Sequence, residues 1–342
     1  MFRNSIRMAH SSSRPCPDYI GESGLKYQFQ QIVQRRPETG SVWIAQAQNR
    51  KYILKERPHP NIRLPRDSVP GQRILVYDYL SHKFLELARN ELAFRDKKSI
   101  LKQTLQGLAE LHNSDIVHLD VKPDNIVVET STNTDRMPTI DAVQVTDIEN
   151  AVWLKPGLNV SGALVGNDNW RSPEAHLRAK LHKPADMYSF EVVCIYAMLG
   201  RIVFGRDADF EYHESLDIDP PVIRLQRQVS VFGDEAGYQG LRRHLSDDPR
   251  HCLLLDVMWE DRGAPHTPYT HFSTWPGVED DAFRDLVLKL MNLDPSSRIT
   301  ASEALQHPWF AEAEASLEFH GLGAIVPTLH TDARSDFTAD GG

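Results

Sequence analysis

The chain has 342 residues, 41% of them hydrophobic and 25% charged, which is the balance of an ordinary folded globular protein. No apolar run approaches the roughly 18–20 residues that a membrane-spanning helix requires, so we expect no membrane partner. The three cysteines are far apart and odd in number, which argues against a disulfide framework or a zinc site. This cysteine usage favours an intracellular location, cytoplasmic or nuclear.

The net charge of −9 is divided unevenly along the chain. Residues 1–100 hold 18 Lys and Arg against 9 Asp and Glu, whereas residues 101–342 hold 20 against 38. This division predicts two electrostatically distinct lobes. The basic residues are scattered and form no patch interleaved with aromatic side chains, so we expect no nucleic-acid partner.

Both ends of the chain read as flexible tails, residues 1–24 and 312–342. The first 17 residues contain three arginines, four serines and no acid. That composition resembles a mitochondrial presequence, but a disordered tail is the favoured interpretation. The final segment is rich in small, acidic and glycine residues, as frayed termini are.

The first folded part is predicted to be β-structure. Strand-like runs occur at 27–33, 41–45 and 51–55, with a turn at 37–40 between the first two. The next 18 residues, 56–73, contain four prolines, so no helix of three turns fits there. Another strand-like run follows at 74–80.

The rest of the chain is predicted to be mostly helical. Residues 99–112 carry apolar side chains at helical spacing, and residues 184–199 are apolar on most sides and end at Gly200, as a central buried helix would. Residues 129–141 are polar and predict a hairpin loop before a strand at 142–147. Further helices are predicted within 229–245, at 282–291 and at 301–310.

The most informative motif is a polar loop within residues 116–128, which lies between two strand-like apolar runs. It places Asp120, Lys122 and Asn125 at i, i+2 and i+5. These residues provide an acid to accept a hydroxyl proton, a cation for a migrating phosphate and an amide for a metal ion. Asp147 ends the next strand and adds a second carboxylate. Hard oxygen ligands of this kind suit Mg²⁺ with bridging phosphates, so the sequence indicates phosphoryl transfer.

These motifs resemble, in order and spacing, those of the eukaryotic protein kinases of Ser/Thr type over residues 26–311. Residues 118–125 are similar to the H-R-D-x-K-x-x-N loop, with Leu119 in place of the arginine. Asp147-Ile148-Glu149 occupies the place of D-F-G, and residues 166–174 are similar to G-T-x-x-Y-x-A-P-E. The resemblance implies an α+β fold with two lobes. A small antiparallel β N-lobe with its hinge would span 25–80, and a larger, mostly α-helical C-lobe 81–311.

The resemblance also implies roles for individual residues. Asp120 would take the proton of the substrate hydroxyl, and Lys122 would neutralise the transferring phosphate. Asn125 and Asp147 would hold Mg²⁺. The ATP-binding residues implied are Gly40 and Val42 of the loop over the phosphates, Lys55 on the α- and β-phosphates, Tyr77 as a gate behind the base, and Asp78 and Leu80 as hinge contacts to adenine.

Four further residues are implied to support the C-lobe. His118 begins the catalytic loop, and Asp186 would hydrogen-bond the backbone of that loop. Glu174 and Arg298 would form a buried ion pair, which requires both charges to be present. Both are present in this chain.

Three features depart from the family pattern. The helix whose glutamate pairs with the anchoring lysine has no room before residue 74. Glu56 would point away from Lys55, because strand neighbours face opposite sides, and Asp67 is a conceivable substitute. Little remains of the Gly-rich loop. Glu149 replaces a glycine and is either a further metal ligand or a restriction on the backbone.

Three functions therefore stay open. The first is an ATP- and Mg²⁺-dependent kinase acting on serine and threonine of protein substrates. The second is a catalytically impaired pseudokinase acting as an interaction module, and the third is a small-molecule phosphotransferase. The segment before Glu174 favours a protein substrate, and nothing in the sequence indicates an obligate oligomer.

The sequence also predicts how activity is regulated. Leu119 removes the arginine that would bind a phosphate on the activation loop. Between Asp147 and Glu174 the only hydroxyl side chains are Ser161 and Ser172. We therefore expect activity without phosphorylation of this loop.

Overall fold

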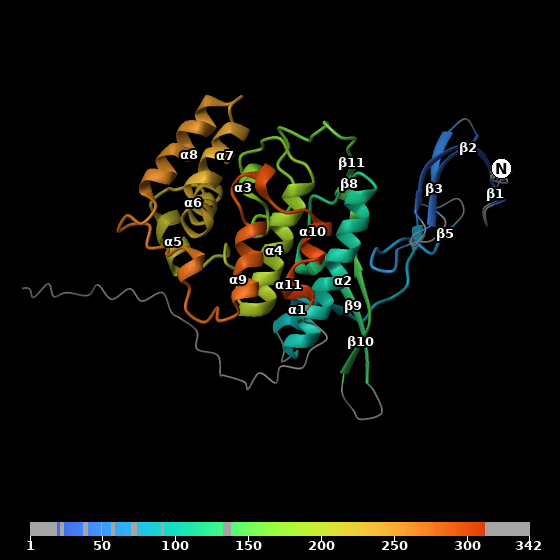
Figure 1. The fold of residues 1–342 in the computed structure, drawn as a ribbon, viewed down its shortest axis with the longest axis horizontal. Helices are drawn as coiled ribbons and strands as arrows, with labels where there is room; N and C mark the ends of the chain where they lie inside the picture. Colours follow the sequence, from blue (N-terminus) through green and yellow to red (C-terminus); the bar gives the residue numbers. More distant parts are fainter. Residues whose placement is uncertain are drawn as a thin grey trace, which may run out of the picture.

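The structure is a computed structural model and describes residues 19–20, 24–36, 40–48, 50–55, 59–69, 74–89, 92–132 and 138–311. A small β-sheet lies at one end of the molecule, and the larger part is helical (Figure 1). This is the predicted two-lobed α+β architecture. The predicted tail 312–342 lies outside the described residues, as does most of 1–24.

The N-terminal sheet has four antiparallel strands in the order β1-β2-β3-β4. They are β1 (Tyr19–Ile20), β2 (Lys26–Arg36), β3 (Gly40–Ala47) and β4 (Arg50–Lys55). The three longer strands cover the runs predicted from sequence. The tail prediction was wrong for Tyr19 and Ile20, which pair with Tyr27 and Lys26 and so extend the edge of the sheet.

The connection after β4 contains no helix in its described part, 59–69. A turn is followed by β5 (Asp67–Val69), which pairs with β6 (Ile74–Val76). The prolines explain this, because they remove backbone donors and block helix propagation. The segment that usually carries a helix in such a fold is therefore extended here.

The turn at 59–62 attaches this connection to the helical lobe. Asn61 accepts a hydrogen bond from the backbone of Val145 at 2.8 Å and donates its side-chain amide to the carbonyl of Val143 at 2.9 Å. Gly107 lies opposite, and a Cβ there would come within 2.6 Å of the Asn61 carbonyl oxygen. Close packing at this point therefore requires glycine at position 107.

The helical lobe contains a three-stranded sheet, ordered β10-β9-β7. The loop prediction for 129–141 was wrong at its ends, because the hairpin strands extend into it until Thr132 pairs with Pro138. Threonine favours strand positions, and the hydroxyls of Ser131 and Thr139 form a hydrogen bond across the strand pair at 2.8 Å. The strands are β7 (His82–Lys83), β8 (Ile116–Val117), β9 (Ile126–Thr132), β10 (Pro138–Val145) and β11 (Val152–Trp153), the last pairing with β8.

The long helices predicted from apolar periodicity are present, and none of the described helices is long and apolar enough to cross a membrane. The chain between 201 and 275 holds four helices where the sequence predicted one. Three of them begin at an aspartate that caps the first turn: Asp207, Asp234 and Asp248. The helices are α1 (Phe84–Arg89), α2 (Phe94–Asn113), α3 (Pro173–His176), α4 (Lys183–Leu199), α5 (Ala208–Ser215), α6 (Pro220–Phe232), α7 (Glu235–His244), α8 (Pro249–Asp261), α9 (Asp281–Leu290), α10 (Ala301–Leu305) and α11 (Pro308–Ala311).

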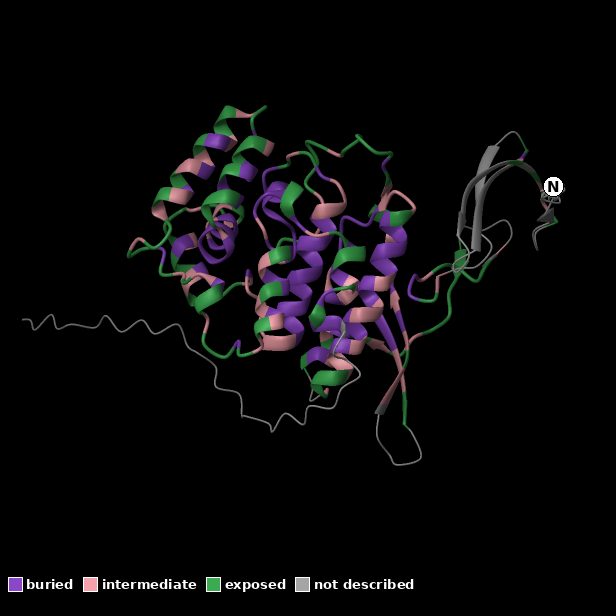
Figure 2. Ribbon diagram, viewed as in Figure 1, coloured by how far each residue is buried: buried purple, intermediate pink, exposed green. Residues whose placement is uncertain are grey.

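Helix α4 is the centre of the core and is buried along most of its length (Figure 2). It packs against α2 and α9. Because it is surrounded by protein, its apolar residues occur on nearly every side, as the sequence indicated. It ends at Gly200, whose φ of 70° lies in the left-handed region that favours glycine.

One buried residue of α4, Glu191, is a carboxylic acid in this otherwise apolar environment. Glu191 is 0% exposed, and neither of its carboxyl oxygens has a hydrogen-bond partner in the described part of the chain. Burial raises the pKa of Glu191 well above its ordinary value, and the nearby Cys194 thiol offsets only part of this rise. The folded protein therefore holds this carboxyl protonated over a pH range in which the unfolded chain has released the proton.

We predict that Glu191 makes stability fall as pH rises. Below the unfolded-state pKa both states are protonated, whereas above it only the folded state still is, so the free energy of unfolding falls by up to about 1.4 kcal/mol per pH unit. Glu191→Gln, a neutral isostere, should remove this slope. Urea unfolding between pH 5 and 8 measures it, with the exposed Glu279→Gln as control. Equal slopes for the wild type and Glu191→Gln would contradict the prediction.

Candidate active site

The catalytic loop between β8 and β9 is held in place by one carboxylate. Asp186, near the start of α4, accepts hydrogen bonds from the backbone N–H groups of His118 at 2.7 Å and Leu119 at 2.8 Å. His112 at the end of α2 contacts the same carboxylate at 2.9 Å. Burial by itself would raise the pKa of Asp186, but these bonds lower it below the ordinary value. Asp186 is therefore a buried anion that fixes the loop to the central helix.

Leu119 connects this loop through apolar contacts to the segment between Asp147 and Glu174, which we call the activation segment. Its φ of 63° is in the left-handed region, which is uncommon for a leucine and turns its side chain inward. It is 6% exposed and belongs to an apolar cluster against which Val160 and Val165 pack. Gly166 lies against its carbonyl, where a Cβ would come within 2.9 Å. The position at which the family pattern has an arginine is thus part of a small hydrophobic core.

The three polar residues of the loop are joined by hydrogen bonds. Lys122 Nζ donates to Asp120 Oδ2 at 2.7 Å, and Asn125 Nδ2 donates to the Asp120 carbonyl at 2.9 Å and to its Oδ2 at 3.1 Å. The backbone N–H of Asp120 donates to His118 Nδ1 at 3.2 Å. His118 Nε2 is then the donor to the Thr146 carbonyl at 3.0 Å. Asp120 is therefore held through its side chain by Lys122 and Asn125 and through its backbone by His118.

The strand β10 brings Asp147 to this loop. The N–H of Thr146 donates to the carbonyl of Asn125 at 2.9 Å, which places the next residue beside the loop. Asp147 is half-buried and adopts a left-handed conformation with φ 62°, which an aspartate tolerates better than most residues. A 3₁₀ turn, Ile148–Asn150, follows, and its Glu149 is exposed.

A pocket of about 310 Å³ opens at this place. Asp120 and Lys122 line it together with Asn150 and residues 164–167. The acid and the cation of the loop thus share an open pocket with the activation segment. A substrate hydroxyl could approach Asp120 there.

The donor set fits a magnesium ion that shares its coordination with phosphate. Asn125 uses Nδ2 for both of its side-chain hydrogen bonds, which leaves its Oδ1 available as a metal-ligand oxygen, and the Asp147 carboxylate is a second candidate ligand. No group of three or more His, Cys, Asp or Glu in the described ranges could hold a metal alone. Mg²⁺ commonly binds through one or two protein oxygens together with substrate phosphates and water, so this set matches its habits.

The predicted hinge residues follow β6 and are tied to the extended connection. Arg63 Nη2 donates to the carbonyl of Asp78 at 2.8 Å, and its guanidinium lies 5.3 Å from the centre of the Tyr77 ring. Arg66 Nη1 donates to Asp78 Oδ1 at 2.9 Å. The sequence reasoning missed both arginines, although their position within a proline-rich connection was visible. They hold the hinge against 59–69, where the absent helix would lie.

The remaining predicted nucleotide contacts are described only in part. The backbones of Val42 and Lys55 pair across β3 and β4, and Gly40 begins β3. The side chains of Val42 and Lys55 lie outside the described residues, as does Glu56. Asp67 is exposed in β5. Leu80 is half-buried after the hinge strand.

The activation segment ends at a buried ion pair. Arg298 donates to the two carboxylate oxygens of Glu174 at 2.6 and 2.8 Å, and their side chains are 0% and 1% exposed. Burial would raise the pKa of Glu174, but Arg298 lowers it below the ordinary value. A bidentate pair of this kind is directional, and removal of one partner leaves a buried charge at a cost of about 3–5 kcal/mol.

Comparison with known proteins identifies a family that matches most of this chain. Residues 32–310 match the family model of the protein kinase domain. Cell division control protein 2 homolog 3 of Trypanosoma brucei brucei is 30% identical over 269 residues, which cover 76% of each chain. The serine/threonine-protein kinase ssn3 of Emericella nidulans is 27% identical over 266 residues, 69% of this chain and 59% of that protein.

Two more similarities are informative about extent and fold. The chain is 25% identical over 275 residues to the serine/threonine-protein kinase/endoribonuclease ire-1 of Caenorhabditis elegans, of which the match covers only 22%. The crystal structure of the yeast RNA Pol II CTD kinase CTDK-1 complex contains a chain with the same fold, with a TM-score of 0.58 and 18% identity. The similarity covers 84% of this chain and 93% of that one.

We predict that Leu119→Arg, which installs the residue of the family pattern, destabilises the protein. The side chain would place a charge inside an apolar cluster, so a loss of about 2–5 kcal/mol in the free energy of unfolding is expected. Chemical denaturation measures it. Leu158→Arg, the same change at an exposed leucine of the same segment, is the control. Equal effects of the two substitutions would show that the Leu119 cluster contributes nothing.

Proposed function

The chain belongs to the protein kinase family, whose members transfer phosphate from ATP to protein hydroxyls, and we propose that Asp120 and Lys122 carry out this transfer to serine and threonine. The match to the protein kinase domain and the Ser/Thr kinase relatives support this activity. The observation that carries the assignment of residues is the hydrogen-bonded group of Asp120, Lys122 and Asn125, of which Asp120 and Lys122 line one pocket.

In this proposal Asp120 orients the acceptor hydroxyl and accepts its proton as the hydroxyl oxygen bonds to the γ-phosphorus of ATP and the bond from that phosphorus to the bridging oxygen of ADP breaks, so that ADP leaves. Lys122, 2.7 Å from Asp120, faces the same pocket and balances the charge of the migrating phosphate. The loop brings both groups in fixed positions, because Asp186 and His118 hold its backbone. Catalysis then comes from positioning and charge neutralisation rather than from covalent chemistry.

Kinases of this family generally use ATP with Mg²⁺, and together these supply the phosphoryl group and neutralise its developing charge. We assign metal binding to Asn125 Oδ1 and the Asp147 carboxylate. Asp78 would also bond adenine through its carbonyl, which has a second lone pair beside the one that Arg63 uses. The other residues proposed to contact ATP are Gly40, Val42, Lys55, Tyr77 and Leu80.

The lobe boundaries, the partner and the cellular location are parts of the same proposal. An N-lobe with hinge would span 25–80, a C-lobe 81–311, and the partner would be a protein substrate. Cys194 and Cys252 are free and buried, which supports a reducing, intracellular location, cytoplasmic or nuclear.

A pseudokinase is the second candidate, and one observation favours it. The described connection 59–69 contains no helix, so it offers no helical glutamate to pair with Lys55. In active kinases that ion pair must be in place. Phosphate transfer by the purified protein decides between the two candidates.

We predict that Asp120→Asn lowers kcat by about 10²–10⁴-fold, because the hydroxyl loses its proton acceptor. Radiolabelled phosphate transfer from Mg·ATP to a generic basic protein measures it. The exposed Asp217→Asn is the matched control and should retain wild-type turnover. Absence of transfer by the wild type, with intact folding, would establish the pseudokinase.

We also predict that Ser161→Ala leaves kcat/KM unchanged. The activation segment is held by the apolar cluster around Leu119, which needs no phosphate. Mass spectrometry of the active protein should find Ser161 unmodified. Activity that appears only after phosphorylation of Ser161 would refute this prediction.

A further inference from the structure

Two arginines, one within the activation segment and one on the adjacent helix α6, have unused hydrogen-bond donors. Arg171, three residues before Glu174, is 6% exposed, and its Nε and Nη1 have no partner in the described part of the chain. Arg224, on α6, is 5% exposed, and its Nη1 likewise forms no hydrogen bond with any described residue. Buried guanidinium groups are normally fully hydrogen-bonded, so open donors at two of them require an explanation.

The carboxylate that bridges these arginines belongs to a surface residue. Asp168 lies 2.9 Å from Arg171 Nη2 and 4.0 Å from Arg224 Nη1, and its side chain is 54% exposed. One carboxylate against two guanidinium groups leaves an excess positive charge. Because Asp168 is half in solvent, it can move aside at little cost. It occupies the place that an incoming anion would take.

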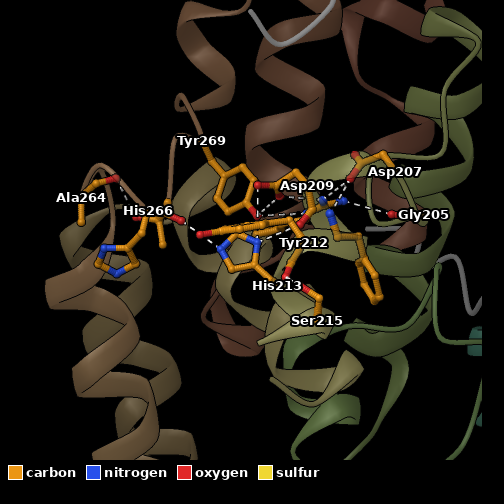
Figure 3. Close-up of polar contacts among 12 residues, drawn as sticks. Gly205, Asp207, Asp209, Tyr212, His213, Ser215, Ala264, His266 and Tyr269 are labelled. Carbon is orange, nitrogen blue, oxygen red and sulfur yellow. Dashed lines mark hydrogen bonds and ion pairs between the residues drawn. The ribbon is translucent and has the colours of Figure 1, made fainter. Parts of the chain in front are cut away.

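A neighbouring arginine on the same helix shows what a completed cluster looks like. Arg227, one turn after Arg224, bonds both Asp207 and Asp209 and lies beside the Tyr269 hydroxyl. Figure 3 shows these two aspartates and the tyrosine converging. Arg227 is thus paired with two carboxylates, and Arg298 with both oxygens of the buried Glu174, whereas Arg171 and Arg224 share the single exposed carboxylate of Asp168. The pair Arg171 and Arg224 lacks a second carboxylate.

A buried neutral imidazole lies beside the two arginines and adds a hydrogen-bond donor. His176 in α3 is 8% exposed, and neither ring nitrogen has a partner among the described residues. Burial, followed by the charges of Arg171 and Arg224, lowers the pKa of His176 to about 3. The ring is therefore neutral at physiological pH and has one N–H to donate to an anion.

This cluster adjoins the proposed transfer site. Gly166 and Asn167 line the pocket with Asp120, and Arg171 Nη2 donates to the carbonyl of Gly166. Asp168 follows at once in the chain. A peptide with its acceptor at Asp120 would thus bring its neighbouring residues over the bridging carboxylate of Asp168.

We propose that Arg171 and Arg224, with His176, form a specificity site for an anionic side chain of the protein substrate, near the acceptor residue, and that Asp168 occupies it in the absence of substrate. The site rests on the proposed function, because it deepens the recognition of the same substrate. Carboxylate and phosphate share the required chemistry, because each carries anionic oxygens that can accept hydrogen bonds from two guanidinium groups.

Synthetic serine peptides test the proposal. One set carries a single Asp, phosphoserine or Ala at each of the three positions on either side of the acceptor. Charge-assisted bonds to two arginines should give the best anionic peptide a kcat/KM at least about tenfold above its alanine counterpart. Phosphoserine superior to Asp identifies prior phosphorylation as the source of the anion, whereas similar values identify an acidic sequence.

Variants locate the site. Asp168→Asn removes the competing carboxylate and should increase the ratio of anionic to neutral kcat/KM further. Arg224→Gln should bring the ratio toward one while the neutral peptide is still phosphorylated. Asp281→Asn, an equal charge change at a 93% exposed residue of α9, should leave the ratio at the wild-type value. Because Asp168 is exposed, Asp168→Asn should fold normally, so it tests the site even where Arg224→Gln fails to fold.

A binding measurement separates this inference from the proposed function. Peptides with alanine in place of the acceptor serine are titrated by fluorescence anisotropy. Preferential binding of anionic peptides without any phosphate transfer would support the site and refute the kinase. Transfer without preference, or a ratio that Asp168→Asn does not change, would refute the site and retain the kinase. Equal binding of all peptides with no transfer would refute both.

Discussion

The catalytic loop depends on one buried carboxylate. Asp186 accepts two successive backbone N–H groups, from His118 and Leu119, and a third bond from His112. The two backbone bonds fix the turn in which Leu119 takes a left-handed conformation, and that turn aims Asp120 at the pocket. Loss of this anion would leave buried donors unpaired at the point where the loop, α2 and α4 meet.

The described part of the connection to the N-terminal sheet, residues 59–69, reaches this lobe without a helix. Asn61 docks on β10, opposite Gly107 on α2, and the arginines at 63 and 66 hold Asp78 of the hinge. The ion pair with Asp78 is exposed and weak, whereas the bonds of Asn61 are buried. Within the described residues, the contact of this connection with the helical lobe therefore depends mainly on the turn at Asn61.

Charge in the helical lobe is distributed according to role. Glu174 with Arg298, and Arg227 with its two aspartates, are saturated and hold elements together. Arg171 and Arg224 share one exposed carboxylate beside the pocket. An arginine that is buried but not saturated keeps hydrogen-bonding capacity for a ligand, and this is the physical difference between a brace and a binding site.

The sequence by itself determined the features that depend on local spacing. The catalytic loop, the strand that leads into Asp147, the central helix and the two residues of the Glu174–Arg298 pair follow from short motifs, because neighbouring residues in a turn or helix have fixed geometry. Tertiary structure decided the rest. Strand pairing extended the β9–β10 hairpin, aspartate caps began three of the four helices between 201 and 275, and packing buried Leu119. The meeting of Arg171 with Arg224 joins residues that are 53 positions apart, and no local pattern encodes it, since only the packing of α6 against the activation segment places the two side chains around one carboxylate.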